Sequence, residues 1–217
     1  MATREKIKLT SYNELLGVNN DMISEIDINK LHQFKDHPFS VVDNEKMFEL
    51  AKSIENNGIL SPLLVRPLGN GEYEIISGHR RKRACEIVGK EKVSAIIKDI
   101  SHEEAIPLMV DANFQREDTL PSEKAKAYKM KMEALAHQGK SSDEMSSAKQ
   151  IGQLAGISDR QVQRYIRLTE LIPELSKLVD DKQITFVLGV EISFLKTEYQ
   201  QLIYENICKG KKVSKDN

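Results

Sequence analysis

Residues 62–84 read Pro62-Leu-Leu-Val-Arg-Pro-Leu-Gly-Asn-Gly-Glu-Tyr-Glu-Ile-Ile-Ser-Gly-His-Arg-Arg-Lys-Arg-Ala84, and this stretch decides the fold of the first half of the chain. Its apolar start, bounded by prolines, predicts a short strand. Gly69-Asn70-Gly71 is a tight hairpin signal, because glycine and asparagine accept the positive φ angles of such turns. Residues 73–77 form the returning strand, and Gly78 ends it. The cationic residues that follow open a helix that Gly89 stops.

The neighbouring residues complete an α/β module. Apolar residues at helical spacing over 47–54 predict a helix, and Asn57-Gly58 supplies its stop. Residues 93–97 are a β-branched strand, and the pattern Ser101-x-x-Glu104 is a capping box that opens another helix. The order helix–strand–strand–helix–strand–helix predicts a small mixed-sheet domain over residues 36–118. Residues 1–35 carry few structural signals and predict a flexible N-terminal arm.

Beyond residue 118 the strand signals disappear. A helix is predicted over 121–138, and Gly139 stops it. Three Ser/Thr-x-x-Gln patterns, at Ser147, Ser158 and Thr197, predict further helix starts. Residues 119–217 therefore predict an all-helical domain, and the fold class is α+β.

Composition limits the function classes. The 217 residues are 40% hydrophobic and 30% charged, which is typical of a globular protein. No apolar run approaches the ~18 residues of a membrane span, and no hydrophobic signal-peptide segment follows Met1. Cys85 and Cys208 share no metal-ligand spacing and favour a reducing compartment. We expect a cytoplasmic protein without a membrane partner, and the net charge of −1 directs attention to local basic clusters.

One such cluster lies in the strongest motif of the helical half, residues 148–168. Ile151, Leu154 and Ala155 are predicted to form the inner face of a short helix. Gly156 permits a sharp left-handed turn, and Ser158 caps a second helix. This pattern predicts a helix-turn-helix.

The outer face of the second helix is polar and basic. Arginine can bind guanine and glutamine can bind adenine through paired hydrogen bonds, and both side chains can hold phosphate, so this face favours double-stranded DNA as the partner. The predicted DNA-binding residues are Lys149, Ser158, Asp159, Arg160, Gln161, Gln163, Arg164 and Arg167. The alternative interpretation is a helical hairpin with a solvated basic face.

The second cluster, residues 79–83, follows Gly78 at a strand-to-helix junction. Free backbone N–H groups and the positive end of the helix dipole make a helix start an anion site. Cations in the first turn oppose that dipole unless an anion binds there. Arg80 and Arg81 are predicted to hold such an anion through charge-assisted hydrogen bonds. A solvated patch or a nuclear-type basic signal is the alternative.

Three short sequence motifs, called boxes here, follow one another in the order found in the ParB/Noc/KorB partition family. The resemblance to this family covers residues 38–200. Residues 50–67 resemble the family pattern L-x-x-S-I-x-x-x-G-x-x-x-P-L-x-V-R. Gly78-His-Arg-Arg-Lys-Arg-Ala84 is similar to the phosphate box G-E-R-R-x-R-A, except at His79. Ala112-Asn-Phe-Gln-Arg-Glu-Asp118 is similar to E-N-x-Q-R-x-D, except at Ala112. The resemblance implies a ParB/sulfiredoxin-like N-domain followed by the helix-turn-helix.

The resemblance implies a CTP-gated DNA clamp that acts in plasmid or chromosome partition, or in regulation, and associates with the nucleoid or plasmid. CTP and Mg2+ would lie between the boxes, two N-terminal domains would close as a homodimer, and a ParA-type ATPase would be a further partner. Carried over, the nucleotide-binding residues are Gly58, Ser61, Pro62, Ser77, Gly78, His79, Arg80, Arg81, Asn113, Gln115 and Arg116, with Asn113 also on the metal side. Family members continue into a C-terminal dimerisation domain, which we expect to be absent from this chain.

One departure from the family bears on turnover. Ala112 replaces a glutamate that the family associates with metal coordination and hydrolysis, and alanine has no oxygen for magnesium. Asp111 is the nearest alternative donor. We therefore expect nucleotide binding, with weak CTPase activity left open. The Gly-x-His-Arg pattern also resembles the sulfiredoxin-type fold, which makes ATP a second candidate ligand. The competing classes are a phosphoryl-transfer or nuclease enzyme and a nucleotide-free scaffold.

Overall fold

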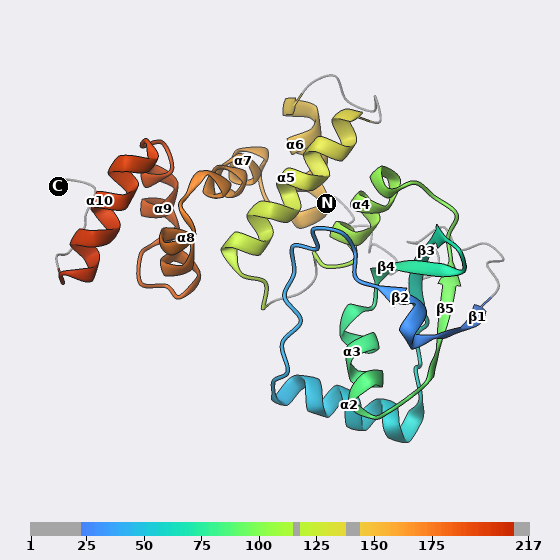
Figure 1. Cartoon of the computed structure of the whole chain (residues 1–217). Coiled ribbons are helices and arrows are strands. Elements are labelled where there is room, and N and C mark those ends of the chain that lie inside the picture. Colours follow the sequence, from blue (N-terminus) through green and yellow to red (C-terminus); the bar gives the residue numbers. More distant parts are fainter. Residues whose placement is uncertain (1–22, 115–117, 138–143, 211–217) are drawn as a thin grey trace, which may run out of the picture. The chain divides into compact units, whose positions relative to one another are not determined.

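The computed structural model describes residues 23–114, 118–137 and 144–210, and the chain divides into two compact units. The first unit holds the described residues up to Phe34 together with Val42–Ile100. The second holds Lys35–Val41 and the described residues from Ser101 onward. Figure 1 shows the elements of each unit along the chain. Within the described ranges, no helix has both the length and the apolar character needed to cross a bilayer.

The first unit is built on a five-stranded mixed sheet in the order β1-β5-β3-β4-β2. Its strands are β1 (Ile23–Asp27), β2 (Leu31–His32), β3 (Leu63–Gly69), β4 (Glu72–Ser77) and β5 (Lys92–Ile97). The central β3 pairs antiparallel with β4 and parallel with β5, and its first three residues are buried. The β3–β4 turn uses positive φ angles of 53° at Asn70 and 75° at Gly71, as the hairpin signal predicted.

Two helices complete this unit, α2 (Glu45–Asn57) and α3 (His79–Ile87), and they pack against each other at a steep angle (Figure 1). Each buries a narrow face: Met47, Ala51 and Ile54 on α2, and Ala84 and Cys85 on α3. The predicted order of helices and strands from α2 to β5 is confirmed.

The flexible arm predicted over residues 1–35 is wrong for its described part, residues 23–35. β1 pairs antiparallel with β5, β2 pairs parallel with β4, and the 3-10 helix η1 (Ile28–Lys30) joins them. The buried side chains Ile26, Leu31 and Phe34 anchor this segment. Residues 1–22 lie outside the described residues.

From Ser101 onward, the regular secondary structure of the second unit is helical in every described part, as predicted. Its elements are α4 (His102–Asp111), α5 (Pro121–His137), α6 (Glu144–Ala155), α7 (Asp159–Arg167), the 3-10 helix η2 (Leu168–Glu170), α8 (Pro173–Asp180), α9 (Phe186–Ile192) and α10 (Thr197–Cys208).

The boundary between the units lies earlier than the predicted residue 118. Helix α4 opens with the predicted capping box of Ser101 and Glu104, and it packs against α5. The segment Lys35–Val41 also belongs to the second unit, because the backbone N–H of Ser40 donates to Oε1 of buried Glu123 at 2.7 Å. The boundary is set by the tertiary contacts of Lys35–Val41 and α4. These contacts cannot be read from the sequence pattern of the two segments.

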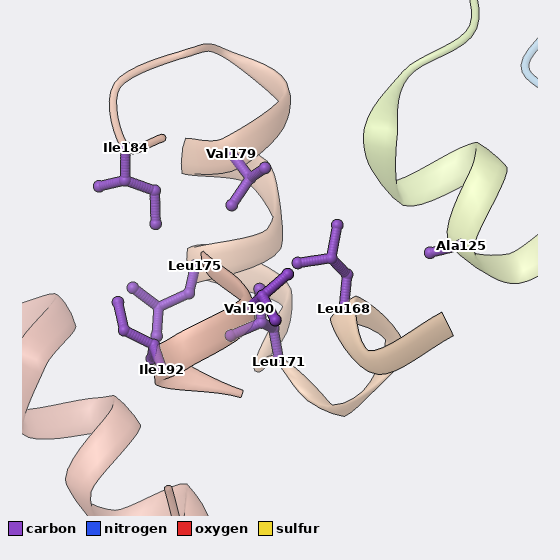
Figure 2. Packing of buried hydrophobic residues seen from close by; sticks show 8 residues of the cluster. All are labelled: Ala125, Leu168, Leu171, Leu175, Val179, Ile184, Val190 and Ile192. Carbon is purple, nitrogen blue, oxygen red and sulfur yellow. The ribbon is translucent and has the colours of Figure 1, made fainter. Parts of the chain in front are cut away.

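Two apolar clusters hold the second unit together. Tyr128, Leu135, Ala148, Ile151 and Val162 form the cluster beneath α6 and α7. The other cluster is shown in Figure 2 and comprises Ala125, Leu168, Leu171, Leu175, Val179, Ile184, Val190 and Ile192. Partly buried Tyr165 packs against both clusters, so α7 is fixed from two sides.

Two of the three predicted Ser/Thr-x-x-Gln caps are wrong. Ser147 lies inside α6, and Thr197 is the first helical residue of α10 after the N-cap Lys196. Gln200 is instead a buried side chain that hydrogen-bonds three backbone groups. Its Oε1 accepts from the N–H of Ile172 at 2.9 Å, and its Nε2 donates to the carbonyls of Glu170 and Leu195 at 3.1 and 3.0 Å.

Candidate functional site

The start of α3 has the geometry of an anion site. Gly78 is its N-cap residue, in the left-handed region at φ 111°, and makes no side-chain cap. A Cβ at Gly78 would lie 2.8 Å from Cγ of Leu63, so close packing as well as the dihedral angle requires glycine. Gly78 offers no side chain to cap the first-turn N–H groups of α3, and such a helix start is a favourable place for an anion.

The basic run after Gly78 separates into paired and unpaired cations. Nζ of Lys82 lies 2.5 Å from Glu86, and Arg83 forms ion pairs with Asp43 at 2.5 Å and Glu86 at 3.2 Å. Hydrogen bonding from Arg83 lowers the pKa of Asp43 below its ordinary value. Burial alone would raise the pKa of Glu86, but its hydrogen bonds from Lys82 and Arg83 outweigh burial and lower it. These two cations therefore stabilise the unit itself.

Arg80 and Arg81 differ in how their charge is used. Nη1 of Arg81 donates to the carbonyl of Ser61 and, at 2.7 Å, to the carbonyl of Pro62. Among the described residues, the Arg80 guanidinium has no hydrogen-bond or ion-pair partner. Arg80 is thus the cation of this run that is available to a ligand, whereas Arg81 joins the first predicted box to the second.

Three other predicted residues lie in the same unit. Ser77 is buried at the end of β4, and Gly58 is the C-cap of α2 at φ 70°. Nε2 of His79 accepts from the backbone N–H of Phe34 at 3.4 Å. The first two boxes lie in the same unit, and the hydrogen bonds from Arg81 bring Ser61 and Pro62 of the first box to the second.

The third box belongs to the second unit. Nδ2 of Asn113 donates to the carbonyl of Met109 at 2.8 Å. Gln115 and Arg116, also predicted to bind nucleotide, lie outside the described residues.

Among the described residues of the third box, no carboxylate is well placed to hold a magnesium ion. Magnesium is usually held by one or two carboxylates, and Ala112 supplies none. Asp111, the alternative donor, is hydrogen-bonded to the ammonium of buried Lys131. Burial raises the pKa of Asp111 and lowers that of Lys131, and the adjacent cation opposes a metal ion at this carboxylate. In the described part of the chain, no group of three His, Cys, Asp or Glu side chains gathers.

A tightly closed turn joins α6 to α7. Gly156 adopts φ 69°, and the N–H of Ile157 donates to the carbonyl of Gly152 at 2.9 Å, which closes a Schellman motif. Oγ of Ser158 then accepts from the N–H of Gln161 at 3.1 Å and caps α7, as predicted. Sequence reasoning missed Gly152, where a Cβ would lie 2.6 Å from the carbonyl oxygen of Ile157. A glycine four residues before the turn glycine was the available signal.

The predicted DNA-binding residues differ in their exposure and in the residues that they contact. Lys149, Ser158, Arg160 and Gln163 are exposed, and Asp159, Gln161 and Arg164 are half-buried. Arg164 stacks over the Phe186 ring, 5.3 Å from its centroid.

Two predictions around this turn change with the structure. Arg167 donates from Nη2 to the carbonyl of Ser193 at 2.7 Å and lies 4.3 Å from the ring centroid of Phe194. These contacts pack α7 against the end of α9, and the DNA-binding role of Arg167 stays a prediction. Leu154, predicted to face inward, is 60% exposed, so that prediction is wrong.

The fold and sites define a class of protein: a mixed-sheet module with a cationic helix start that follows a glycine, joined in sequence to a helical unit with a tight turn between α6 and α7. Residues 12–114 match the family model of the ParB N-terminal domain. The chain is 29% identical over 199 residues to the nucleoid occlusion protein of Listeria monocytogenes, which covers 92% of this chain and 66% of that protein. It is 38% identical over 141 residues to the chromosome-partitioning protein Spo0J of Thermus thermophilus, covering 65% of this chain and 48% of that protein.

A solved structure gives the same result. The C-terminally truncated chromosome-partitioning protein ParB of Caulobacter crescentus, complexed to the centromeric parS site, matches with a TM-score of 0.54 and 25% identity over 86% of this chain and 92% of that chain. Residues 12–114 therefore form a ParB N-terminal domain, and the matches to partition and nucleoid occlusion proteins extend into the helical unit. The chain spans 48% and 66% of the length of the two curated relatives named above.

Proposed function

We propose that this protein is a sequence-specific DNA-binding protein of the ParB type, whose DNA binding is gated by CTP. DNA is recognised by α6 and α7, and the triphosphate is held at the start of α3. The proposal extends to partition or nucleoid-associated regulation, because the relatives are chromosome-partitioning and nucleoid occlusion proteins.

The observation that carries the DNA half is the closed α6–α7 turn with its one-sided distribution of side chains. Ile151 and Val162 are fully buried between the helices, whereas Lys149, Arg160 and Gln163 are exposed. A rigid helix that presents arginine and glutamine can read base edges in the major groove, while lysine neutralises phosphate. The ParB of Caulobacter crescentus, which shares this fold, was solved on its DNA site.

The nucleotide half rests on Gly78 and Arg80. Gly78 leaves the first N–H groups of α3 uncapped, and Arg80 adds a cation without a described protein partner. A triphosphate would satisfy both groups. The matching boxes favour CTP as the nucleotide, with ATP as the second candidate.

The DNA half is tested with a duplex selected from a random pool by the purified protein. Binding of Arg160→Ala, Gln163→Ala and the parent is followed by fluorescence anisotropy. Lys177→Ala, which removes an exposed lysine of α8, is the matched control. Loss of one base contact is expected to cost about 1–3 kcal/mol and to relax the preference at one base position. Equal affinity and equal preference for the parent and both α7 variants would refute recognition by α7.

The nucleotide half is tested by calorimetry with CTP, ATP and inorganic tripolyphosphate, each with and without Mg2+. Arg80→Ala is expected to weaken all of these ligands together, whereas Lys82→Gln, which removes a paired cation of the same helix, is expected to leave them unchanged. A parent protein that binds no nucleotide would be a scaffold, and the gating proposal would fail.

Family membership also supports a homodimer that closes through the N-terminal domains, and a ParA-type ATPase as partner. Sedimentation with and without CTP and the selected duplex tests closure. A monomer under every condition would contradict it.

A further inference from the structure

A hollow of about 390 Å3 lies in the second unit, between α5, α8 and the η2 segment that follows α7. Its floor is the outer side of the apolar cluster in Figure 2, where Ala125 of α5 lies opposite Leu168 and Leu171. All three side chains are buried, so the packed core holds this floor in place. The hollow has the volume of about a dozen water molecules, which is within the range of small-molecule sites.

Hydrogen bonds between two helices bound one end of the hollow. The backbone N–H and Oγ of Ser122, in the first turn of α5, donate to the two carboxylate oxygens of Asp180 at 2.9 and 2.5 Å. Asp180 is the last residue of α8, so this link joins the start of one wall to the end of the other. A hollow bounded in this way suits a compact ligand better than an extended peptide, which needs a groove that continues past both ends.

Two ammonium groups and a hydroxyl lie around the apolar floor. Lys126 of α5 is exposed, and no described residue pairs with its ammonium. Lys177 of α8 lies 3.0 Å from Asp181, and water largely screens this surface pair. The hydroxyl of half-buried Ser176 also has no described partner. These groups match a ligand that carries one anionic group on an apolar body.

The neighbouring charges disfavour a nucleic acid as the occupant. Glu170, Glu174 and Asp181 are exposed, and each directly follows a residue that lines the hollow. A polyanion that crosses this surface would meet three carboxylates, which repel it. A single anionic group inside the hollow instead meets the unpaired ammonium of Lys126.

We propose that this hollow binds a small amphipathic anion, a carboxylate or a phosphate monoester, whose apolar body rests on Leu168 and Leu171 and whose charge pairs with Lys126. The hollow also adjoins the end of α7, because Thr169 lines it and donates from Oγ1 to the carbonyl of Ile166 at 2.8 Å. Ligand binding here is independent of the proposed DNA recognition, since no residue of α7 lines the hollow.

The experiment titrates the isotopically labelled full chain with four probes and follows its backbone amide signals by NMR. Phenylpropionate and phenyl phosphate carry an anionic group on an apolar body, phenylpropanol has the body without the charge, and acetate has the charge without the body. We expect the two amphipathic anions to bind with a Kd of about 1 mM, which is ordinary for ligands of about ten non-hydrogen atoms, and the other two to bind about tenfold more weakly. The shifted amides should include those of Ala125, Leu168 and Ser176.

Two variants and a control test the contacts, and circular dichroism checks their folding. Lys126→Gln should weaken phenylpropionate and phenyl phosphate by about tenfold, the value of one charge-assisted hydrogen bond, and leave phenylpropanol within about twofold of the parent's affinity. Ser176→Leu places a larger side chain in the hollow and should weaken all three aromatic probes by about tenfold or more. Lys129→Gln removes a lysine of the same helix that pairs with Glu170, and it should bind every probe as the parent does.

Each outcome decides for or against the site. If Lys126→Gln and Ser176→Leu bind both amphipathic anions as tightly as the parent does, the anions bind elsewhere and the proposal is overturned. A parent that binds neither anion at about ten times the expected Kd has a hollow that holds only solvent, which also overturns it. If Lys126→Gln instead weakens duplex binding and reduces its salt dependence, Lys126 belongs to a DNA interface and the proposal fails. Tighter binding of phenyl phosphate than of phenylpropionate supports a phosphate monoester as the ligand, and the reverse order supports a carboxylate.

Discussion

Replacing Gly152 by alanine is expected to separate α6 from α7. The added Cβ would lie 2.6 Å from the carbonyl oxygen of Ile157, whereas ordinary contact begins at 3.4 Å, so the two must move apart by about 0.8 Å. Overpacking costs about 1–3 kcal/mol, and a contact this short with a backbone atom belongs at about 2–3 kcal/mol, of which the better helix propensity of alanine offsets ~1 kcal/mol. We therefore expect a net loss of about 1–2 kcal/mol in the free energy of unfolding.

The assay combines thermal unfolding with DNA binding below the transition. A loss of that size lowers the unfolding midpoint of a unit of this length by roughly 4–16 °C. DNA affinity should fall by more than the unfolded fraction explains, because α7, the helix proposed to read the bases, would shift relative to α6. Gly156→Ala is the matched control: no atom lies within 4 Å of its Cβ, and only the φ of 69° is strained. It should lose about 1–2 kcal/mol of stability yet bind DNA as the parent does. If Gly152→Ala kept the parent's midpoint and affinity, the close contact would not exist as described.

Three further results are expected. Lys149→Ala should weaken binding to all duplexes alike and reduce the slope of log affinity against log salt by about 1, and an unchanged slope would remove Lys149 from the interface. Ala112→Glu should add a carboxylate for magnesium and make release of phosphate from CTP faster than in the parent; equal rates would show that the missing glutamate does not limit turnover. Burial, and then the nearby Tyr165, raise the pKa of Tyr128 to about 12 from 10.0. The folded state thus keeps the phenol neutral, and this stabilisation is complete below pH 10 and is lost as the pH rises towards 12. Tyr128→Phe should show a smaller fall in urea midpoint between pH 9 and pH 11, and equal falls would contradict this cause.

The basic run shows what a local pattern can and cannot predict. Its position after Gly78 indicated an anion site, and the uncapped helix start has that geometry. The pattern could not show that Lys82 and Arg83 pair with Glu86 and Asp43, or that Arg81 donates to carbonyls twenty and nineteen residues earlier. Four adjacent cations look alike in sequence, and their partners come from other segments.

The α6–α7 turn shows the same difference between local signals, which were predictable, and tertiary contacts, which were not. Gly156 and Ser158 were predictable, because a left-handed turn and an N-cap are local requirements met by residue type. The exposure of Leu154 and the bond from Arg167 to Ser193 were not, because they depend on how α6 and α9 pack.

The sequence by itself determined the order of elements from α2 to β5, the β3–β4 turn, the capping of α4 and α7, and the family boxes. Each of these depends on residues within a few positions of one another. Only the tertiary structure decided that residues 23–32 form both edges of the sheet, that the buried Gln200 side chain hydrogen-bonds three backbone groups, and that Lys35–Val41 and α4 join the helical unit. These features arise from hydrogen bonds and packing between distant segments, whose free energy does not depend on local propensity or periodicity.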